Sequence, residues 1–464
     1  MQENKVKISD LMNNRFDVYF HLPFFYNEMK LLRKSPFKIY KLSELCTQIT
    51  DGTHYTPNYV DNGIKFISVK NIKENIIDFN DTKFISYDEH KNFIKRCKPE
   101  PNDILLTKIG TIGNVCIVPE NAPEFSIFVS VALLKLQKNI ISPFYMQAVL
   151  STVFVKSQIK RELKGIGVPD LHLENICNIQ IPVPNSIEEQ NIIAGMLQNA
   201  YTQKQEKETK AQKLVEEIND IVLAALNINI PKIENKKEYK TTFSSIFNNR
   251  LDPKYHEPQY EELNKILENH PDCINLLKTF NNDGLIKGYL PKEKEKNGTI
   301  NYLQIRNVQL DGTIDIKELA NAEQGIYKDS QKLKKNDIII VATGATIGKI
   351  GLWNEEQDCY LGGDMYKFQT NSDFEPYYIL AYLLTPLGQL QIKRSITGAT
   401  NGHLSLFDIE NIKIIKPAAS IQKEISNEYI NRLSQAKELI NKANKEFEEV
   451  KNKVEKIILG EESL

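Results

Sequence analysis

Residue types that can carry acid–base chemistry occur twice in this chain with the same spacing. Each set holds an Arg, an Asp, a His and a Pro: Arg15, Asp17, His21 and Pro23, then Arg250, Asp252, His256 and Pro258. A carboxylate beside an imidazole could serve as a general acid–base pair. Because the sets recur at the same place in two copies, we favour a structural ion pair that closes each domain against the helices.

A glycine-rich run, Gly344–Lys349, has some features of a phosphate-binding loop. A P-loop needs four residues between its glycines and a Ser or Thr after the lysine. Here three residues separate Gly344 from Gly348, and Ile350 follows the lysine. The corresponding run in the first half places Asn114 where lysine would stand. The pattern therefore favours a turn between two strands over a nucleotide site.

Both features belong to an internal repeat with an offset of about 235 residues. Phe66–Ile72 corresponds to Tyr302–Val308, and Asn102–Gly113 corresponds to Asn336–Gly348. Solenoid repeats span only ~20–50 residues, so a period this long indicates a duplicated domain. Two similar domains present two similar surfaces, and we therefore expect a two-part ligand.

The bulk composition is that of a folded protein. At 464 residues, with 41% hydrophobic and 26% charged residues, the chain is expected to form about two to four domains. Its six cysteines are dispersed without a CxxC pair, which favours a reducing cytoplasm over disulfides or a zinc site. The first residues lack a signal-peptide pattern, and the longest apolar stretch, Phe125–Leu136, is too short to span a bilayer. We expect a cytoplasmic protein without a membrane partner.

The charge balance gives little support to nucleic-acid binding by itself. The formal net charge is −1. Residues 36–185 hold 17 Lys and Arg against 15 Asp and Glu, and residues 246–418 hold 20 against 23. Local basic clusters occur at Lys91–Lys98 and Lys156–Lys164, where a solvated face is the favoured interpretation. If the chain binds DNA, partner subunits are expected to supply part of the contact with phosphates.

The order of elements predicts an α+β fold with two tandem mixed α/β domains, each followed by a long helix. Short β-rich runs with turn residues between them, and a helix over Pro143–Leu163, indicate the mixed content of the first domain. The expected segments are a lead at 1–35, a first domain at 36–185, a first long helix at 186–226, a linker at 227–245, a second domain at 246–418 and a second long helix at 419–460.

Each long helix carries a narrow apolar stripe with heptad-like spacing. The two stripes consist of Ile193, Leu197, Ala200, Ala211, Leu214, Ile218, Ile221 and Ala225, and of Leu433, Ala436, Ile440, Ala443, Phe447, Val450, Val454 and Ile457. Helices with such stripes are not stable alone in water, so the economical partner for each is the other helix. We expect them to pair.

Three motifs, in this order, carry a resemblance to a known family. They are Ile49–His54, the run from Asp103-Ile104-Leu105-Leu106 to Gly110-Thr111-Ile112-Gly113, and Ile181–Pro184 followed by Glu188-Glu189-Gln190. The second half departs from them, with Asp283-Gly284-Leu285 and Gln422-Lys423-Glu424 at the matching places. In the order and duplication of these motifs, the chain resembles the DNA-specificity (S) subunit of type I restriction-modification systems over nearly its whole length.

The resemblance implies a fold, a role and a set of partners. The two long helices would pair as an antiparallel coiled coil, and each domain would read one half of a split target in double-stranded DNA. The chain would have no catalytic residues, metal or cofactor of its own; no Asn-Pro-Pro-Tyr-like tetrad and no methyl-donor loop are present. Two adenine-N6 methyltransferase (M) subunits would dock on the helix region, and a translocating nuclease (R) subunit could join them.

Base recognition requires forked donors and acceptors in exposed loops. The candidates in the first domain are Thr53, His54, Tyr55, Lys70, Asn71, Lys108 and Thr111. Those in the second domain are Lys287, Tyr289, Arg306, Asn307, Lys349, Arg394, Thr400, Asn401 and His403. For Lys70-Asn71 and Arg306-Asn307, turn chemistry with a solvated cation is an equally good explanation.

Two other functions remain open from the sequence. One is a coiled-coil scaffold that holds two protein-binding domains. The other is a tandem two-domain enzyme, for which the duplicated Asp and His are the only support. The sequence does not define the DNA target, the spacer length or the stoichiometry of a complex.

Overall fold

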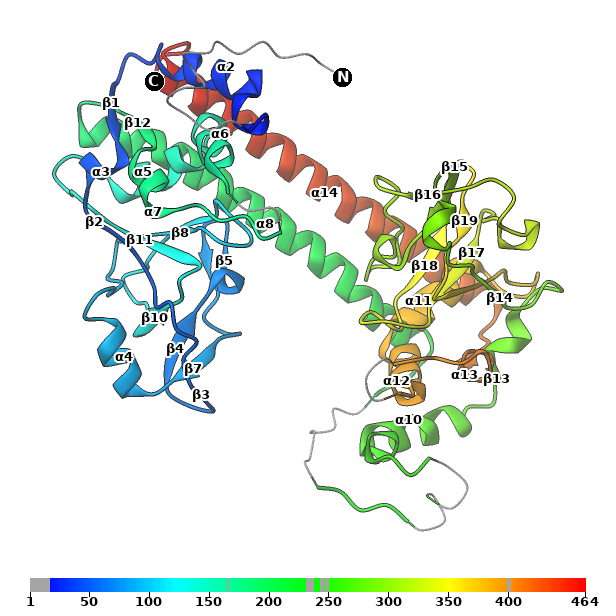
Figure 1. Ribbon diagram of the computed structural model, residues 1–464. Coiled ribbons are helices and arrows are strands. Elements are labelled where there is room, and N and C mark those ends of the chain that lie inside the picture. The colour runs from blue at the N-terminus through cyan, green and yellow to red at the C-terminus, as the bar shows by residue number, and fades with distance from the viewer. Residues whose placement is uncertain (1–16, 165–166, 231–237, 243–245, 247–249, 399–401) are drawn as a thin grey trace. The chain divides into compact units, whose positions relative to one another are not determined.

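The computed structural model describes residues 17–164, 167–230, 238–242, 246, 250–398 and 402–464. These residues form two compact units (Figure 1). Unit 1 comprises the described residues up to Glu206 together with Lys442–Leu464, and unit 2 comprises Lys207–Asn441. Both boundaries fall inside long helices, so each unit contains part of α8 (Ile187–Ala225) and part of α14 (Ala419–Leu459).

Unit 1 contains two four-stranded sheets. The first has the order β2-β11-β8-β9, with β2 at Cys46–Asp51, β11 at Val131–Leu136, β8 at Ile104–Thr107 and β9 at Val115–Ile117. The second has the order β10-β4-β7-β3, with β10 at Phe125–Ile127, β4 at Ile64–Ile67, β7 at Lys83–Ile85 and β3 at Tyr59–Val60. Two antiparallel pairs complete the unit: β1 (Lys38–Lys41) with β12 (Gln180–Val183), and β5 (Ile72–Lys73) with β6 (Ile76–Ile77).

Short helices connect these strands. The α-helices are α2 (Pro23–Leu32), α3 (Leu42–Leu45), α4 (Tyr87–Phe93), α5 (Pro143–Leu150), α6 (Val153–Glu162) and α7 (Leu173–Cys177). The 3-10 helices are η1 (Tyr19–His21) and η2 (Val69–Asn71).

Unit 2 repeats this plan. Its larger sheet has the order β14-β20-β17-β18, with β14 at Ile286–Lys287, β20 at Met365–Phe368, β17 at Asp337–Val341 and β18 at Ile350–Trp353. Its second sheet has the order β16-β15-β19, with β16 at Ala320–Ala322, β15 at Lys296–Leu303 and β19 at Tyr360–Leu361. The pair β13 (Cys273–Asn275) and β21 (Lys413–Ile415) is the counterpart of β1 and β12.

The helices of unit 2 follow the same order along the chain. The α-helices are α10 (Pro258–Glu268), α11 (Pro376–Leu384), α12 (Pro386–Ser395) and α13 (Leu406–Glu410). The 3-10 helices are η3 (Pro253–His256), η4 (Leu276–Thr279), η5 (Glu293–Glu295), η6 (Ile305–Asn307) and η7 (Asp329–Gln331). The duplicated mixed fold inferred from the sequence is confirmed.

The predicted helix over Pro143–Leu163 is two helices. Thr152 adopts an extended conformation between α5 and α6, and its hydroxyl donates to the Val149 carbonyl at 2.6 Å. Unit 2 has the same break at Thr385, whose hydroxyl donates to the Tyr382 carbonyl, also at 2.6 Å. There, Pro386 follows and disfavours helix at Thr385. The first copy has valine after its threonine, so its sequence gave no such signal.

The apolar run Phe125–Leu136 is also divided. Residues 125–127 form β10, and residues 131–136 form β11, which lies in the other sheet. The turn between them is closed by a hydrogen bond from the Val131 amide to the Phe128 carbonyl at 2.9 Å. The single hydrophobic run therefore supplies one strand to each of the two sheets, and the turn at Phe128–Val131 separates the two strands.

The long helices α8 and α14 pair in antiparallel orientation. In unit 1, Tyr201 of α8 packs on Phe447 of α14 with ring centroids 6.3 Å apart. In unit 2, Arg432 of α14 donates to Glu217 of α8 at 2.5 Å. The first half of α8 thus meets the second half of α14, and the reverse holds in unit 2. In the described part of the chain, no helix has a stretch apolar and long enough to cross a membrane.

A glutamine at the equivalent position fixes the first turn of each long helix. Gln190 accepts from the Ser142 amide at 2.8 Å and donates to the Pro184 carbonyl at 3.1 Å. Gln422 accepts from the Glu375 amide at 3.1 Å and donates to the Pro417 carbonyl at 3.2 Å. The Gln422-Lys423-Glu424 sequence, which appeared to depart from the first copy, therefore retains the residue that docks the helix.

A buried ion pair joins the central strands of each unit. In unit 2, Lys367 Nζ lies 2.7 Å from Asp337 Oδ2, and both side chains are at most 3% exposed. In unit 1, Lys135 Nζ lies 2.7 Å from Asp103 Oδ2, but Lys135 is 19% exposed and also meets Glu100. The pair in unit 2 is thus the more completely desolvated of the two.

Removing one partner of the buried pair should destabilise unit 2 selectively. We expect Lys367→Met to lower the free energy of unfolding by about 3–5 kcal/mol, because Asp337 would stay buried without its cation. Trp353 is the single tryptophan of the sequence and lies opposite Asp337 on β18, so its fluorescence during urea unfolding reports on unit 2. Lys135→Met is the control: equal shifts of the tryptophan transition in both variants would contradict the prediction.

Candidate nucleic-acid interface

In unit 1, loops from distant parts of the chain meet at one edge. A Cβ at Gly110 would lie 3.8 Å from Val69, so the β8–β9 loop touches η2. Ile109 pairs with Asp170, which brings in the loop after α6. Lys108 Nζ lies 3.6 Å from Asp51 Oδ2 at the end of β2. Most candidates of the first domain are thereby collected at this edge.

Unit 2 assembles the same edge with other side chains. A Cβ at Gly344 would lie 3.5 Å from Ile305, so the β17–β18 loop touches η6. Thr343 pairs with His403, as Ile109 pairs with Asp170 in unit 1. The segments that carry the candidates Arg306, Lys349 and His403 therefore meet at this edge.

The counterpart of the Asp51-Gly52-Thr53 motif is Lys287-Gly288-Tyr289, and not Asp283-Gly284-Leu285 as the sequence suggested. The Thr53 amide donates to the Ile127 carbonyl, and the Tyr289 amide donates to the Leu361 carbonyl, both at 3.1 Å. A Cβ at Gly52 or at Gly288 would lie within 2 Å of the neighbouring strand's carbonyl oxygen. Only glycine allows this approach, whereas the residues on either side of it differ between the copies.

Asp51 organises the edge in unit 1. Its side chain is 3% exposed, and Oδ1 accepts from Arg96 Nη2 at 2.5 Å and lies 3.2 Å from His54 Nε2. Lys108 is buried between Asp51 and Asp170, 3.4 Å from the latter. Because Arg96, Lys108 and His54 all contact this one carboxylate, the exposed Arg96 and His54 are held in place on the surface.

The remaining residues of this loop differ in exposure. Thr53 is buried, and its hydroxyl accepts from the Tyr55 amide at 3.2 Å. Tyr55 is 78% exposed. Of the loop residues, Tyr55 and His54 are therefore accessible to a ligand, whereas Thr53 supports the turn.

An aromatic cluster occupies the same place in unit 2. Tyr289 packs edge-on against Tyr327, which stacks on Tyr360 with centroids 5.0 Å apart. The Tyr289 hydroxyl donates to Glu295 at 2.9 Å. Burial, reinforced by neighbouring Tyr302, raises the pKa of Tyr327, so this phenol stays neutral. Lys287, at the position of Asp51, is exposed.

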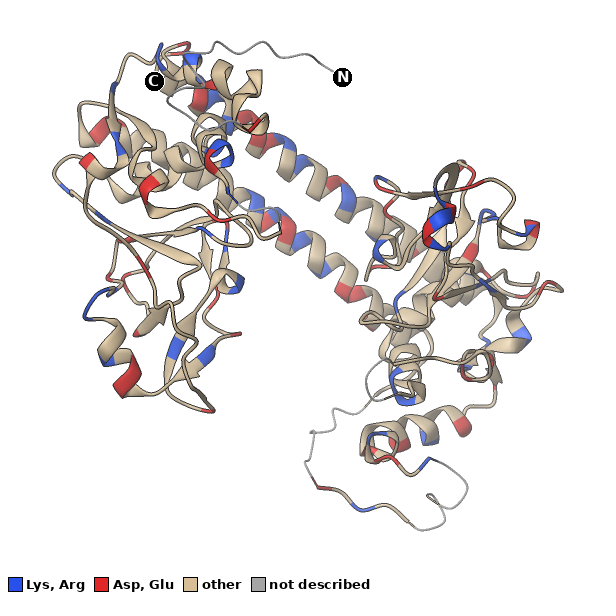
Figure 2. Ribbon diagram, in the orientation of Figure 1, with Lys and Arg blue, Asp and Glu red and all other residues tan. Residues whose placement is uncertain are grey.

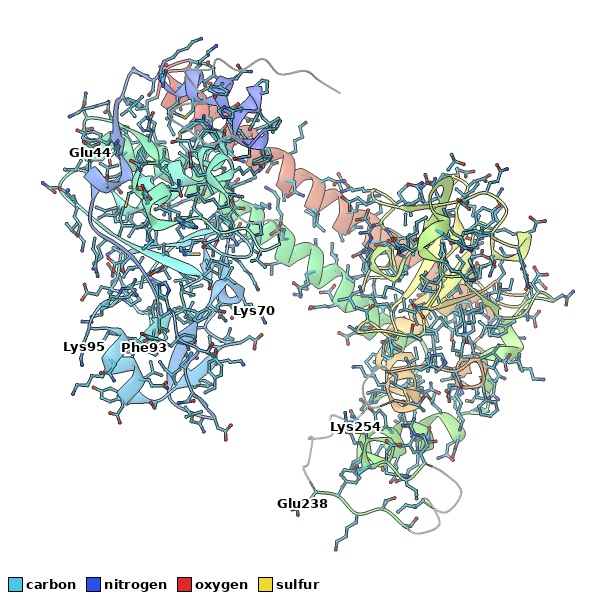
Figure 3. The ribbon with its side chains drawn as sticks, in the orientation of Figure 1. Glu44, Lys70, Phe93, Lys95, Glu238 and Lys254 are labelled. Atoms are coloured by element: carbon cyan, nitrogen blue, oxygen red, sulfur yellow. The ribbon has the colours of Figure 1, made fainter. Side chains whose placement is uncertain are left out.

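The two Lys/Arg-Asn pairs separate into an exposed cation and a buried amide. Asn71 accepts from the Ser68 amide at 3.0 Å and donates to the Asp81 carbonyl at 2.6 Å. Asn307 likewise accepts from the Gln304 amide at 2.9 Å and donates to the Asp315 carbonyl at 2.8 Å. These contacts favour the turn explanation for both asparagines. Lys70 and Arg306 are exposed, and Figure 3 labels Lys70 beside β5.

The Gly110–Asn114 and Gly344–Lys349 loops are hairpin turns. Each connects two antiparallel strands, and all four flanking glycines have φ between +82° and +92°. No helix follows the loop, so it lacks the helix N-terminus that a phosphate-binding loop uses. Thr111 is exposed and Lys349 is half-buried on these turns.

The duplicated Asp and His sets lie before the first strand of each unit and pack there. Asp252 accepts from the Tyr255 amide at 3.2 Å and pairs with Arg250 Nε at 2.6 Å. His256 Nε2 lies 2.5 Å from the Arg250 carbonyl oxygen. Arg394 donates to the Tyr255 carbonyl at 3.0 Å and covers the Tyr255 ring at 4.1 Å. Arg394 therefore holds η3 to α12.

Unit 1 has the same packing. Asp17 accepts from the Phe20 amide at 3.0 Å, and Arg161 donates to the Phe20 carbonyl at 3.1 Å while covering its ring at 3.9 Å. His21 Nδ1 lies 2.8 Å from the Tyr26 hydroxyl. The described contacts thus tie η1 to α6, as η3 is tied to α12. Arg15 lies outside the described residues, as do the candidates Thr400 and Asn401.

Sequence reasoning missed Asp51 and Arg96 as parts of this edge. Arg96 stands in the basic cluster Lys91–Lys98, and Asp51 stands in the Ile49–His54 motif, so both were visible. The pairing of these two residues, 45 positions apart, could not be seen in the sequence.

Acidic and basic residues are interspersed along both units and both long helices (Figure 2). In the part of the chain that the structure describes, no group of His, Cys, Asp and Glu is arranged to hold a metal ion.

Comparisons with known proteins place the chain in a family. The family model "Type I restriction modification DNA specificity domain" matches residues 34–217 and 278–449. The chain is 28% identical over 167 residues to the "Type I restriction enzyme EcoBI specificity subunit" of Escherichia coli, which covers 36% of this chain and 35% of that relative. The match thus spans about a third of the relative's length.

Two solved structures are similar over most of their length. One, described under "Structural basis underlying complex assembly and conformational transition of the type I R-M system", has a TM-score of 0.44 and 14% identity, covering 92% of this chain and 97% of that one. The other, the type I restriction-modification S subunit from M. genitalium, has a TM-score of 0.41 and 13% identity, covering 91% and 96%. Because the two family-model matches cover more than half of the chain, the protein belongs to the type I restriction modification DNA specificity domain family.

Proposed function

We propose that this chain is the non-catalytic sequence-reading subunit of a type I restriction-modification complex. Each unit reads one half of a bipartite target in double-stranded DNA. Two adenine-N6 methyltransferase subunits dock on the helix region and methylate one adenine in each half-site. A translocating nuclease subunit joins this complex for restriction.

The observation that carries this proposal is a shared scaffold with different side chains at equivalent loop positions. The backbone pairing around Gly52 and Gly288 is the same, yet Asp51 is replaced by Lys287 and Thr53 by Tyr289. Selection for packing alone would not require an ion-pair cluster in one copy and a tyrosine cluster in the other. Two readers of two different DNA sequences do require such divergence.

The residues proposed to contact DNA are the exposed and half-buried ones at the two loop edges. They are His54, Tyr55, Lys70, Arg96 and Thr111 in unit 1, and Lys287, Arg306, Lys349 and His403 in unit 2. Lys and Arg can donate to guanine or phosphate, and hydroxyl and imidazole groups accept or donate to base edges. The buried Asn71, Asn307 and Lys108 support the loops that present them.

The paired helices act as the spacer between the two readers. α8 has 39 residues and α14 has 41. At ~1.5 Å per residue, helices of this length extend about 60 Å. A rigid spacer of tens of ångströms fixes the number of unread base pairs between the half-sites, since half-site spacing follows protein geometry.

Deleting the gene in its host should remove one bipartite motif from the genome's N6-methyladenine pattern. Single-molecule sequencing of the deletion strain and of the strain with the gene restored measures this directly. Loss and recovery of two short defined blocks around a fixed gap is the expected result. An identical pattern in both strains, with the methyltransferase genes expressed, would refute the proposal.

Exchanging the first domain should change only half of the target. Replacing residues 36–185 with the first domain of another family member leaves α8, α14 and unit 2 in place. We expect one half of the methylated motif to change, while the other half and the gap stay the same. A changed gap would contradict the spacer role of the helices, and changes in both halves would contradict one reader per unit.

Lys70 and Asn71 form a matched pair for testing individual residues. Lys70→Ala should weaken binding of the complex to its target about tenfold or more, as expected for loss of a charged contact worth ~1–3 kcal/mol, and leave stability unchanged. Asn71→Ala should instead lower the free energy of unfolding by about 1–3 kcal/mol, because the Ser68 amide and the Asp81 carbonyl lose their partner. Fluorescence anisotropy with target DNA and urea unfolding measure the two effects. Normal affinity of Lys70→Ala would remove this loop from the interface.

A further inference from the structure

Unit 1 contains a cavity of about 470 Å³ beside the long helices. Its walls come from α5, the β5–β6 hairpin, the first half of α8 and the second half of α14. The side chains that define it are Phe144, Gln147, Ser151, Leu197, Tyr201 and Phe447. The lining is thus part aromatic and part hydrogen-bonding.

The same place in unit 2 is filled by the chain itself. Tyr429 of α14 is 1% exposed and packs on Tyr377 with ring centroids 6.0 Å apart. Its hydroxyl donates to the Asp311 carbonyl of the hairpin at 2.6 Å. The hairpin turn is so close that a Cβ at Gly312 would lie 2.3 Å from that hydroxyl and 2.8 Å from Leu384.

Hydrogen bonds shared by the two units establish which positions correspond. Gln190 and Gln422 dock the two helices in the same way, so Leu197, seven residues later, corresponds to Tyr429. Tyr145 donates to the Pro182 carbonyl as Tyr378 donates to the Ile415 carbonyl. Phe144 therefore corresponds to Tyr377.

The cavity results from three exchanges at these corresponding positions. Counting from the same anchors, Leu197 stands for Tyr429, Ser151 for Leu384 and Gln147 for Leu380. Each of these three exchanges puts a smaller or more polar side chain in unit 1. A fourth adds a ring: Tyr201 stands for Leu433, and its hydroxyl donates to the Glu74 carbonyl of the hairpin at 2.9 Å. The cavity is open to solvent, and concave sites lined by aromatic and apolar side chains with a few polar groups are the usual form of a binding site.

The rim supplies an accessible ring and positive charge. Phe144 is 42% exposed. Glu74 on the hairpin pairs with Lys156 at 2.8 Å. Burial raises the pKa of Glu74, but the bond and charge of Lys156, with Lys451 and Lys204, lower it overall. Lys451 also pairs with Glu448 at 3.7 Å, so three lysines face two carboxylates, and one positive charge remains in excess to meet a further negative group.

We propose that this cavity receives an aromatic side chain of a partner polypeptide, with a neighbouring carboxylate of the partner meeting the rim lysines. Tyr429 in unit 2 is the template for the occupant. The partner is the methyltransferase subunit, so this inference rests on the proposed function. Because unit 2 fills its own cavity, this anchor exists for only one of the two methyltransferase copies, and they dock unequally.

Filling the cavity tests the proposal. The first variant, Leu197→Tyr, introduces the residue that unit 2 has at the equivalent position, Tyr429. The second, a double variant with Gln147→Leu and Ser151→Leu, introduces the equivalents of Leu380 and Leu384 and narrows the cavity. Sedimentation of the full chain with its methyltransferase subunit should show at least tenfold weaker binding of one methyltransferase copy for both variants. Asn139→Tyr, an exposed position outside the cavity, is the control and should bind normally.

A second measurement uses the unaltered chain. Hydroxyl-radical oxidation of Phe144 should fall several-fold when the methyltransferase subunit binds. Normal affinity of the filled variants together with unchanged Phe144 oxidation would overturn the cavity proposal while leaving the proposed function intact. Failure of the unaltered chain to bind the methyltransferase would overturn both.

Discussion

The structure depends on the inability of a long, narrowly amphipathic helix to stand alone in water. α8 and α14 each bury their apolar side chains in two ways: against the other helix and in the hydrophobic cores of the units. Ile193 and Leu197 of α8 join Val454 and Ile457 of α14 in the core of unit 1. Ile218 and Val222 join Ile425 and Tyr429 in the core of unit 2. Consequently neither unit has a complete core without its parts of both helices.

Duplication of the fold left the scaffold almost unchanged and altered what it presents. Three side chains recur with equivalent hydrogen-bond partners in both units. They are the glutamine at the start of each long helix, the threonine between α5 and α6 or between α11 and α12, and the asparagine of η2 or η6. The loop side chains beyond them do not recur. The loops therefore change their chemistry without moving the strands that support them.

The sequence predicted the large features because they are encoded by periodicity. The repeat, the strand-rich domains and the paired long helices each extend over many residues, and all are present. The stripes are less regular than predicted: Ile440 is 42% exposed, and Val222 and Leu226 are buried more deeply than the predicted Ile221 and Ala225. Single-position equivalence was harder. Asp283-Gly284 was taken for the counterpart of Asp51-Gly52 because the letters match, but hydrogen bonding across the sheet selects Lys287-Gly288. The close approach of a carbonyl oxygen to a glycine places no requirement on the types of the neighbouring residues, so the sequence alone does not reveal it.

For the candidate residues, the sequence indicated which lie in loops but not which side chains are accessible. Lys70 and Asn71 are neighbours of similar polarity, yet one is exposed and the other is buried with its amide fully used. Arg394 appeared available and instead covers Tyr255. Whether a polar side chain serves the fold or the ligand depends on partners far away in sequence, and local composition does not contain that information.

The composition of unit 1 has a consequence for biosynthesis. Its core includes Val454, Ile457 and Ile458, whereas its sheets are complete by Val183. On the ribosome, the nascent first domain must wait for all of unit 2 before these residues emerge. At ~5–20 residues per second, that delay is on the order of ten seconds to a minute. During that interval the apolar groove that α14 later covers is open to chaperones, so efficient production of this protein should depend on them.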